Sequence, residues 1–329
     1  MIQYNQYDEY AGDIGMLKNP NIFYIHWSPD IFCNYKCSYC FPGSNSTDRH
    51  HLPIDVLIKG LQDLKFKINH ILGIPKIDLT FSGGEPTLIP GFLQLIEAYD
   101  KDNSENQTLS ICTNLTRGRK WWNEFLEVTK GLKSITINAS WHRESVGDVN
   151  IARQKFLEIG NLFKSHKRNF RITMVLPPSQ FDDIYSDALF FRKNDIHTLI
   201  RVERKYIEKV MGMHPDYNND MINDIITWNK SNRILFVRKE KDLIEEQYNN
   251  VEQAIALGKT NYLNWKCYAG TSSVIIKPDG SIKRAWSCRD APIGNIKNAN
   301  YFLSEEPQKC ITPKCGCSSD MNSPKVRTI

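Results

Sequence analysis

Between residues 21 and 204, six short apolar runs alternate with helix-like stretches, and this alternation constrains the fold more than any other feature. Each run is rich in Ile, Val, Phe or Thr and is flanked by turn-forming residues, which is typical of β-strands. Strands that alternate with helices build a parallel sheet, because each crossover helix returns the chain to the same edge. The expected strands are Asn21–Ser28, Ile77–Ser82, Leu109–Asn114, Ser134–Ser140, Arg171–Leu176 and Thr198–Arg204.

The stretches between these runs carry apolar residues at spacings of three and four, which predicts amphipathic helices. Pro53 stands at the start of the first of them, a favoured position for proline. The expected helices are Ile54–Lys67, Gly91–Tyr99, Trp121–Lys130, Ile151–Lys164 and Phe181–Arg192. This order fits an α/β barrel, open or closed, and sequence alone does not separate it from a doubly wound sheet. In a barrel, the chemistry belongs at the carboxyl ends of the strands.

The pattern changes after about residue 205. A polar, Asn-rich stretch follows, with expected helices at Asn223–Trp228 and Lys241–Ala256 and an expected strand at Arg233–Arg238. Further on, Ser273–Ile276 and Ser281–Arg284 flank a Pro-Asp-Gly turn and predict a β-hairpin. The rest is poor in core residues but rich in cysteine, which favours folding around a metal. We expect a division into an N-terminal extension (1–20), a barrel (21–205), a bridging segment on the substrate side (206–262) and a cysteine-rich domain (263–329).

The composition sets the class and the compartment. The formal net charge is only +5, too small to indicate nucleic acid by itself. No run of about 18 apolar residues suggests a membrane span, and the N-terminus does not resemble a signal peptide. The nine cysteines are an odd number and are clustered. We therefore expect a cytoplasmic protein whose cysteines serve metal or redox chemistry rather than a disulfide framework.

The first cysteine group directly follows the first expected strand. Cys33, Cys37 and Cys40 have three and then two residues between them. Three thiolates suit a [4Fe–4S] cluster, because its fourth iron then stays open for a substrate or cofactor. A structural zinc site would need a fourth ligand, which His50 or His51 would supply, and this is the alternative for the group taken alone.

A second motif, Phe81-Ser82-Gly83-Gly84-Glu85-Pro86, ends the second expected strand. Together with the cysteine spacing and the aromatic residue before the last cysteine, it resembles the radical S-adenosylmethionine (SAM) superfamily. The resemblance implies a partial (β/α)6 TIM-like barrel over about residues 20–205. It implies that the three cysteines hold a [4Fe–4S] cluster whose open iron binds SAM. One electron would then cleave SAM into methionine and a 5′-deoxyadenosyl radical, which abstracts hydrogen from the substrate.

The same resemblance implies which residues contact SAM. An aromatic residue of the cysteine loop would lie near the adenine, and the Gly-Gly-Glu turn would engage the methionine ammonium group. Polar residues after the third and fourth strands would meet the ribose or the carboxylate, although helix caps and solvated loops use the same residue types. The implied SAM contacts are Tyr39, Gly83, Gly84, Glu85, Asn114, Ser140, His142 and Val175.

The second cysteine group lies around and after the expected hairpin. A cysteine, the hairpin, another cysteine and a Gly-Asn turn resemble the auxiliary-cluster extension of radical SAM enzymes, in its short "twitch" form, a relative of the SPASM extension. The resemblance implies a second [4Fe–4S] cluster on four of five cysteines, with either Cys315 or Cys317 completing the set. Seven residues separate Gly280 from the next cysteine, which departs from the family pattern. The five candidates are Cys267, Cys288, Cys310, Cys315 and Cys317.

These patterns predict a radical SAM oxidoreductase or maturase. Its auxiliary cluster would accept an electron from the substrate radical or bind the substrate, and an external donor such as flavodoxin or ferredoxin would supply electrons. The substrate stays open between a small polar metabolite, either a carbohydrate or nucleotide-linked, and a peptide of the ribosomally synthesised, modified kind. The alternative is a nucleic-acid-modifying radical SAM enzyme with a C-terminal zinc knuckle, which the lack of a basic stripe with interleaved aromatic residues disfavours.

Overall fold

The computed structural model describes residues 7–18, 21–40, 46–101, 106–207, 210–229, 236–239, 246–248, 251–288 and 290–328. At its centre is a ten-stranded sheet in the order β16-β15-β14-β13-β2-β3-β4-β5-β6-β7. Strands β2 to β7 are parallel and pair in sequence order, which confirms the expected strands and the partial barrel. They are β2 Ile22–Trp27, β3 Lys76–Phe81, β4 Gln107–Thr113, β5 Ser134–Trp141, β6 Asn169–Leu176 and β7 His197–Val202.

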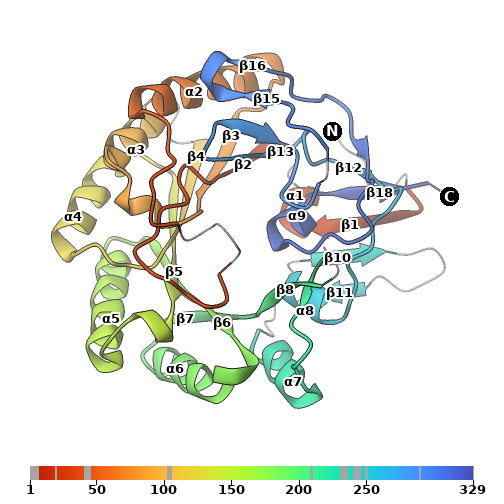
Figure 1. The fold of residues 1–329 in the computed structure, drawn as a ribbon. Coiled ribbons are helices and arrows are strands. Elements are labelled where there is room, and N and C mark those ends of the chain that lie inside the picture. The colour runs from red at the N-terminus through yellow and green to blue at the C-terminus, as the bar shows by residue number, and fades with distance from the viewer. Residues whose placement is uncertain are drawn as a thin grey trace.

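Five helices form an arc around the outside of these parallel strands (Figure 1). All five helices expected from the sequence in this region are confirmed to within about two residues. The Asp148 side chain caps one of them by accepting hydrogen bonds from the Asn150 and Ile151 amides, which starts the helix at that point. The five are α2 Ile54–Phe66, α3 Phe92–Asp100, α4 Arg119–Val128, α5 Val149–Ser165 and α6 Phe181–Lys193.

The two faces of the sheet differ in chemistry because side chains alternate along each strand. The residues that face the helices are large, apolar and fully buried, among them Trp27, Phe81 and Trp141. The alternate residues are polar and line the inner face of the partial barrel, for example His26 and Arg171. The core therefore lies between sheet and helices, and the inner face remains available to a site.

The expected C-terminal hairpin is present and closes one side of the barrel. Its strands are β13 Ser273–Ile276 and β14 Ser281–Lys283. Strand β13 pairs in parallel with β2, although about 250 residues separate the two in sequence. Two short strands, β15 Gly294–Asn295 and β16 Asn300–Tyr301, extend this edge.

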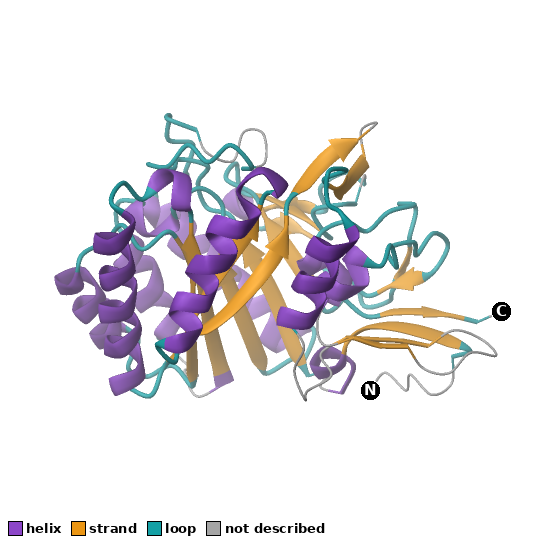
Figure 2. Ribbon diagram, turned by 90° about the horizontal axis from the view of Figure 1, so that it is seen from below, coloured by secondary structure: helices purple, strands orange, loops and turns teal. Residues whose placement is uncertain are grey.

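A second, six-stranded sheet combines both ends of the chain, in the order β11-β10-β1-β18-β12-β17. Strand β1 pairs antiparallel with β18, so the described N- and C-terminal strands lie side by side (Figure 2). Sequence reasoning did not predict this sheet. Its strands are β1 Glu9–Asp13, β10 Phe236–Lys239, β11 Glu246–Tyr248, β12 Lys266–Cys267, β17 Gln308–Lys309 and β18 Lys325–Arg327.

One expectation for the bridging segment is corrected by the structure. The helix expected over Lys241–Ala256 is wrong as a single element, because β11 occupies Glu246–Tyr248 and only Val251–Ala256 forms helix α8. Residues 241–245 and 249–250 of this stretch, like 233–235 of the expected strand, lie outside the described residues. The other elements are α1 Ile14–Lys18, β8 Arg204–Ile207, β9 Val210–Met213, α7 Asn219–Trp228 and α9 Ser318–Asn322. In the described part of the chain, none of the helices combines the length and apolarity needed to span a bilayer.

Candidate active site

The first cysteine group lies in the loop that leaves the carboxyl end of β2. A buried carboxylate shapes the entry to this loop. Asp30 Oδ1 accepts hydrogen bonds from the amides of Ile31 at 2.8 Å, Phe32 at 3.1 Å and His50 at 2.9 Å. The loop therefore begins in a fixed conformation at the edge of the sheet where chemistry is expected in a barrel.

The three thiols lie within electrostatic reach of one another. Burial, together with the charges of the neighbouring Cys40 and Cys33, raises the pKa of Cys37 to about 11, although a hydrogen bond with Ser145 opposes the rise. The Cys33 sulfur accepts from the Tyr35 amide at 3.4 Å. Three soft ligands crowded together at a loop, two of them only half-buried, fit an iron–sulfur cluster that keeps one open position.

The Gly-Gly-Glu turn after β3 packs directly against the entry to the cysteine loop. A Cβ on Gly83, whose φ is +114°, would lie 2.3 Å from Ser28 Oγ, and a Cβ on Gly84 would lie 2.1 Å from the Phe32 carbonyl oxygen. The Glu85 amide also donates to that carbonyl oxygen at 2.7 Å. Glycine is thus required at both positions, because any side chain would push the two loops apart.

Glu85 is 1% exposed and accepts four hydrogen bonds. Thr87 donates from its amide at 3.1 Å and its hydroxyl at 2.5 Å, Thr113 Oγ1 donates at 2.8 Å, and the Asn114 amide donates at 2.6 Å. Burial raises the pKa of Glu85, and these donors oppose the rise. Sequence reasoning missed Thr87, although a hydroxyl two residues after a buried carboxylate is a recognisable signal.

The loop after β5 docks onto the cysteine loop. Tyr39 Oη and His142 Nδ1 are 3.0 Å apart, with their rings stacked at 5.8 Å. Ser38 Oγ donates to Glu144 at 2.9 Å. Burial lowers the pKa of His142 to about 4, so the imidazole is neutral near pH 7. The structure thus joins two predicted SAM contacts, and sequence reasoning missed the contribution of Glu144.

The remaining predicted contacts are spread along the same edge. Asn114 Nδ2 donates to Asn34 Oδ1 at 2.9 Å and lies 3.8 Å from Cys33 Sγ, so it touches the cysteine loop. Ser140 and Val175 lie on the inner-face positions of β5 and β6. Among the described residues, no hydrogen bond joins the Ser140 side chain to the other predicted contacts, and the Val175 side chain has no polar atom.

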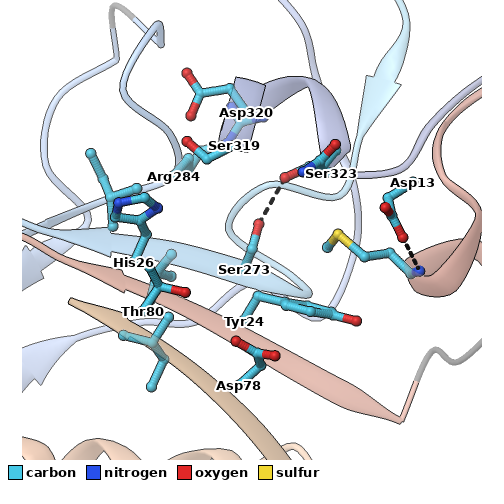
Figure 3. Close-up of a pocket in the computed structure, with 15 residues that line it drawn as sticks. Asp13, Tyr24, His26, Asp78, Thr80, Ser273, Arg284, Ser319, Asp320 and Ser323 are labelled. Atoms are coloured by element: carbon cyan, nitrogen blue, oxygen red, sulfur yellow. Dashed lines mark hydrogen bonds between the residues drawn. The ribbon is translucent and has the colours of Figure 1, made fainter. Parts of the chain in front are cut away.

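A cavity of about 200 Å³ lies between the inner face of the sheet and α9 (Figure 3). Tyr24 and His26 on β2 and Thr80 on β3 face Ser319 and Asp320 of α9 across it. His26 Nε2 and Ser82 Oγ are 2.6 Å apart, next to the Gly-Gly-Glu turn. Burial and the charge of a nearby arginine lower the pKa of His26 to about 4. The inner face of the barrel is therefore partly open and polar close to the cysteine loop.

The second cysteine group surrounds the end of the six-stranded sheet. Cys267 ends β12, and Cys310 follows the neighbouring strand β17, with its amide donating to the Trp265 carbonyl oxygen at 2.7 Å. The Cys315 amide donates to the Thr260 carbonyl oxygen at 2.9 Å. Cys317 Sγ instead lies 3.0 Å from Ser319 Oγ of α9. Cys288, Cys310 and Cys315 each lie within electrostatic reach of Cys267, whereas the Cys317 side chain contacts α9.

A buried ammonium group lies beneath this second group. Lys325 Nζ donates to three backbone carbonyl oxygens, two of them at 2.8 Å. Burial lowers its pKa, but the charges of Cys315, Cys267, Asp320 and Cys310 raise it above the ordinary lysine value. A cation at this place favours thiolates, which are the form that binds metal. Over the described ranges, no three His, Cys, Asp or Glu side chains are arranged to hold a single metal ion.

Residues 28–191 match a family model described as "Radical SAM superfamily". The chain belongs to this superfamily, and its fold and cysteine loop agree with that assignment. The family implies a [4Fe–4S] cluster and SAM as cofactors.

Among curated relatives, the chain is similar to the cysteine-type anaerobic sulfatase-maturating enzyme of Clostridium perfringens (strain ATCC 13124). The two are 24% identical over 269 residues, which cover 76% of this chain and 70% of the relative. It is also similar to the GTP 3′,8-cyclase of Edwardsiella ictaluri, at 34% identity over 95 residues. That match spans 28% of this chain and 27% of the cyclase.

Two solved structures share the fold. A polyhistidine-tagged form of anSMEcpe with bound AdoMet, another abbreviation of SAM, matches with a TM-score of 0.55 and 20% identity over 84% of this chain and 75% of that one. Native anSMEcpe with bound AdoMet and the Kp18Cys peptide matches with a TM-score of 0.56 and 20% identity, over 84% and 78% of the two chains.

Proposed function

We propose that this chain reductively cleaves SAM and uses the product to abstract hydrogen from a substrate, which it oxidises or modifies. The observation that carries the proposal is the meeting of Cys33, Cys37 and Cys40 with the Gly-Gly-Glu turn at the carboxyl ends of β2 and β3. When bound, the cluster and SAM supply a 5′-deoxyadenosyl radical. The chain supplies the ligands, the orientation of SAM and the exclusion of water.

The residues around the cysteine loop suit a cationic and aromatic ligand. Among the described residues, Glu85 Oε2 accepts one hydrogen bond, from Asn114, and a carboxylate oxygen can accept two. Its second lone pair is therefore available to an ammonium group. Tyr39 is held in place by His142, so its ring is fixed before an adenine stacks near it. Gly83 and Gly84 keep this carboxylate within reach of the cysteine loop.

For the auxiliary cluster we propose the ligands Cys267, Cys288, Cys310 and Cys315. Burial raises the pKa of each of the other three, and the charge of Cys267 contributes to each rise, so all three lie within electrostatic reach of Cys267. Cys317 is also within electrostatic reach of Cys315, but its side chain contacts Ser319 and lies close to Asp320 and Arg204. A [4Fe–4S] cluster binds each thiolate at a different iron, which suits four thiols that do not converge on one ion. This arrangement supports a cluster rather than a zinc knuckle and disfavours the nucleic-acid alternative.

For the substrate we favour a peptide. A curated relative that covers 76% of this chain is a sulfatase-maturating enzyme, and a protein of the same fold has been solved with a peptide bound. A small polar metabolite is the second candidate, and the polar inner face of the barrel favours it. An external electron donor of the flavodoxin or ferredoxin type would reduce the first cluster.

The test is anaerobic reconstitution followed by reduction with dithionite in the presence of SAM. We expect about eight irons per chain and formation of 5′-deoxyadenosine. Peptides deuterated at candidate positions should then transfer deuterium into 5′-deoxyadenosine. A reconstituted protein that holds iron but forms no 5′-deoxyadenosine would refute the proposal.

A further inference from the structure

The inner face of the barrel carries basic groups that the SAM chemistry does not use. The interior of a TIM barrel is ordinarily filled by branched apolar side chains. Here the inner-face positions of β4 to β7 are mostly polar, and two of them are arginines. They include Cys112, Asn138, Ser140, Arg171, Thr173 and Arg201.

Arg171 on β6 has no acidic partner in the parts of the chain that the structure describes. Its Nε donates to Asn138 Oδ1 on the neighbouring strand, directly across in register. Among the described residues, no carboxylate lies within ion-pairing distance of its guanidinium group. Burial lowers its pKa, and the charge of Arg201 on the neighbouring strand β7 lowers it further, so two cations lie near each other on the inner face. An uncompensated charge in such a place is costly unless a ligand completes it.

Arg201 on β7 is only weakly compensated. Its side chain is 37% exposed although it projects from the inner face, so it borders open space. The Glu252 carboxylate lies 4.0 Å away, but it already accepts two hydrogen bonds from Arg204 at 2.7 and 2.8 Å. Arg201 Nη1 donates to Ser318 Oγ at 3.5 Å, and the buried Nε has no hydrogen-bond partner among the described residues.

A third donor stands between the two arginines. Thr173 lies on β6 two residues from Arg171, and two residues before Val175, which pairs with Arg201 in register. Its hydroxyl is buried and, within the described part of the chain, has no hydrogen-bond partner. Two guanidinium groups and a hydroxyl thus offer unused donors to the same part of the lumen. Guanidinium groups bind carboxylates and phosphates with two parallel hydrogen bonds.

We propose that Arg171 and Arg201 bind an oxyanion of the substrate, a carboxylate or a phosphate, inside the barrel. The inference rests on the proposed function, since it names the group by which that substrate is held. In a peptide the group is a side-chain or C-terminal carboxylate, and in a metabolite it is a carboxylate or phosphate. Anchored there, the substrate extends from the lumen toward the cysteine loop at the carboxyl ends of the strands.

The test measures binding of inorganic phosphate and of acetate to the reconstituted, SAM-saturated protein by calorimetry. Arg171→Gln and Arg201→Gln should each weaken binding of the preferred anion at least about tenfold, and the double variant should abolish it. The matched control is Arg119→Gln, which removes the same charge from an exposed ion pair with Glu158 and should bind as the wild type does. Arg201→Lys keeps the charge but loses the two parallel donors of the guanidinium group. Its affinity for the anion should therefore lie between those of the wild type and of Arg201→Gln.

Three outcomes would overturn the inference: no binding of either anion to the wild type, equal binding by the double variant and the Arg119→Gln control, or competition between the anion and SAM. Preference for acetate supports a carboxylate substrate, and preference for phosphate a phosphorylated one. Circular dichroism and iron content establish that the variants are folded. Formation of 5′-deoxyadenosine without substrate is measured in parallel. Its absence in the wild type would refute the proposed function. The anion-binding results test the present inference independently of that outcome.

Discussion

The two cysteine groups lie in contrasting settings. The first occupies an irregular loop, and side chains of neighbouring loops hold it in place, such as Asp30 and Glu144. The second is built into backbone hydrogen bonds of a sheet, and three of its thiols, Cys267, Cys310 and Cys315, are buried. A loop held by side chains can leave one face open to a ligand, whereas a sheet-bound group is closed. From this difference we propose that the first group reacts and that the second stores or passes charge.

The charges near the two cysteine groups also differ. The first lies near the carboxylates of Glu85 and Glu144, and the second lies near the cations of Lys325 and Arg284 as well as the carboxylate of Asp320. Hydrogen bonds and charges around a cluster tune its potential, and a nearby cation stabilises the reduced, more negative state. We therefore expect the second cluster to accept electrons more readily than the first, which suits a role as acceptor from the substrate radical.

The largest expected effect tests the first cysteine group, which we propose to be the reactive one. Replacing Cys33, Cys37 and Cys40 together by Ala removes every proposed ligand of the first cluster. Formation of 5′-deoxyadenosine should disappear, and the iron content should fall by about half. Cys317→Ala is the control and should form the product at the wild-type rate. Product formation by the triple variant, detected by mass spectrometry, would contradict the proposed site.

The next effect tests which cysteines form the closed group. Cys267→Ala should lose about four irons per chain, because the other three proposed ligands lie around this thiol. Cys317→Ala should retain all of them, since its sulfur faces Ser319. Iron and sulfide assays with Mössbauer spectra measure both. If the Cys317 variant loses iron and the Cys315→Ala variant does not, the assignment is reversed.

The barrel could be predicted from sequence because its signals are local. Each strand–helix unit carries its own periodicity, and the hairpin carries its Pro278-Asp279-Gly280 turn, with Gly280 at φ +82°. The cysteine spacing and the Gly-Gly-Glu turn are local as well. The meeting of Tyr39 with His142 was foreseen only in part, since the resemblance assigned both residues to SAM and not to each other.

The second sheet could not be predicted because its pairings are remote. Strand β1 pairs with β18 across almost the whole chain, and strands as short as β12 and β17 carry no periodicity. Local signals predict a helix in the polar run before Ala256, yet part of this run pairs with Phe236–Lys239 and forms strand β11. Lys325 likewise shows no sign in sequence of being buried among thiols. Non-local burial overrides local propensity in each case.

A smaller effect concerns the Lys325 ammonium group, which lies next to the second cysteine group. Lys325→Met removes the donor to the Asp320, Met321 and Ser323 carbonyl oxygens and leaves them buried. The free energy of unfolding should fall by about 1–3 kcal/mol, measured by denaturant titration. The midpoint potential of the auxiliary cluster should become more negative, measured by a redox titration followed by electron paramagnetic resonance. Lys314→Met, at an exposed position in the same segment, is the control, and an equal potential shift in it would refute the role of Lys325.

The smallest effect is a pH dependence at the open group. The pKa of His142 is about 4 in the folded chain, against about 6.5 in an unfolded one, because burial disfavours the imidazolium. A base whose pKa is lowered by folding destabilises the fold on acidification, so stability should decline as the pH falls from about 6.5 toward 4. In His142→Asn this part of the decline should be absent, at the cost of a weaker hold on Tyr39. Chemical denaturation at a series of pH values measures the slope. An unchanged slope would mean that His142 is hydrated in the folded protein and that the cysteine loop is more open than its contacts with Glu144 and Ser145 indicate.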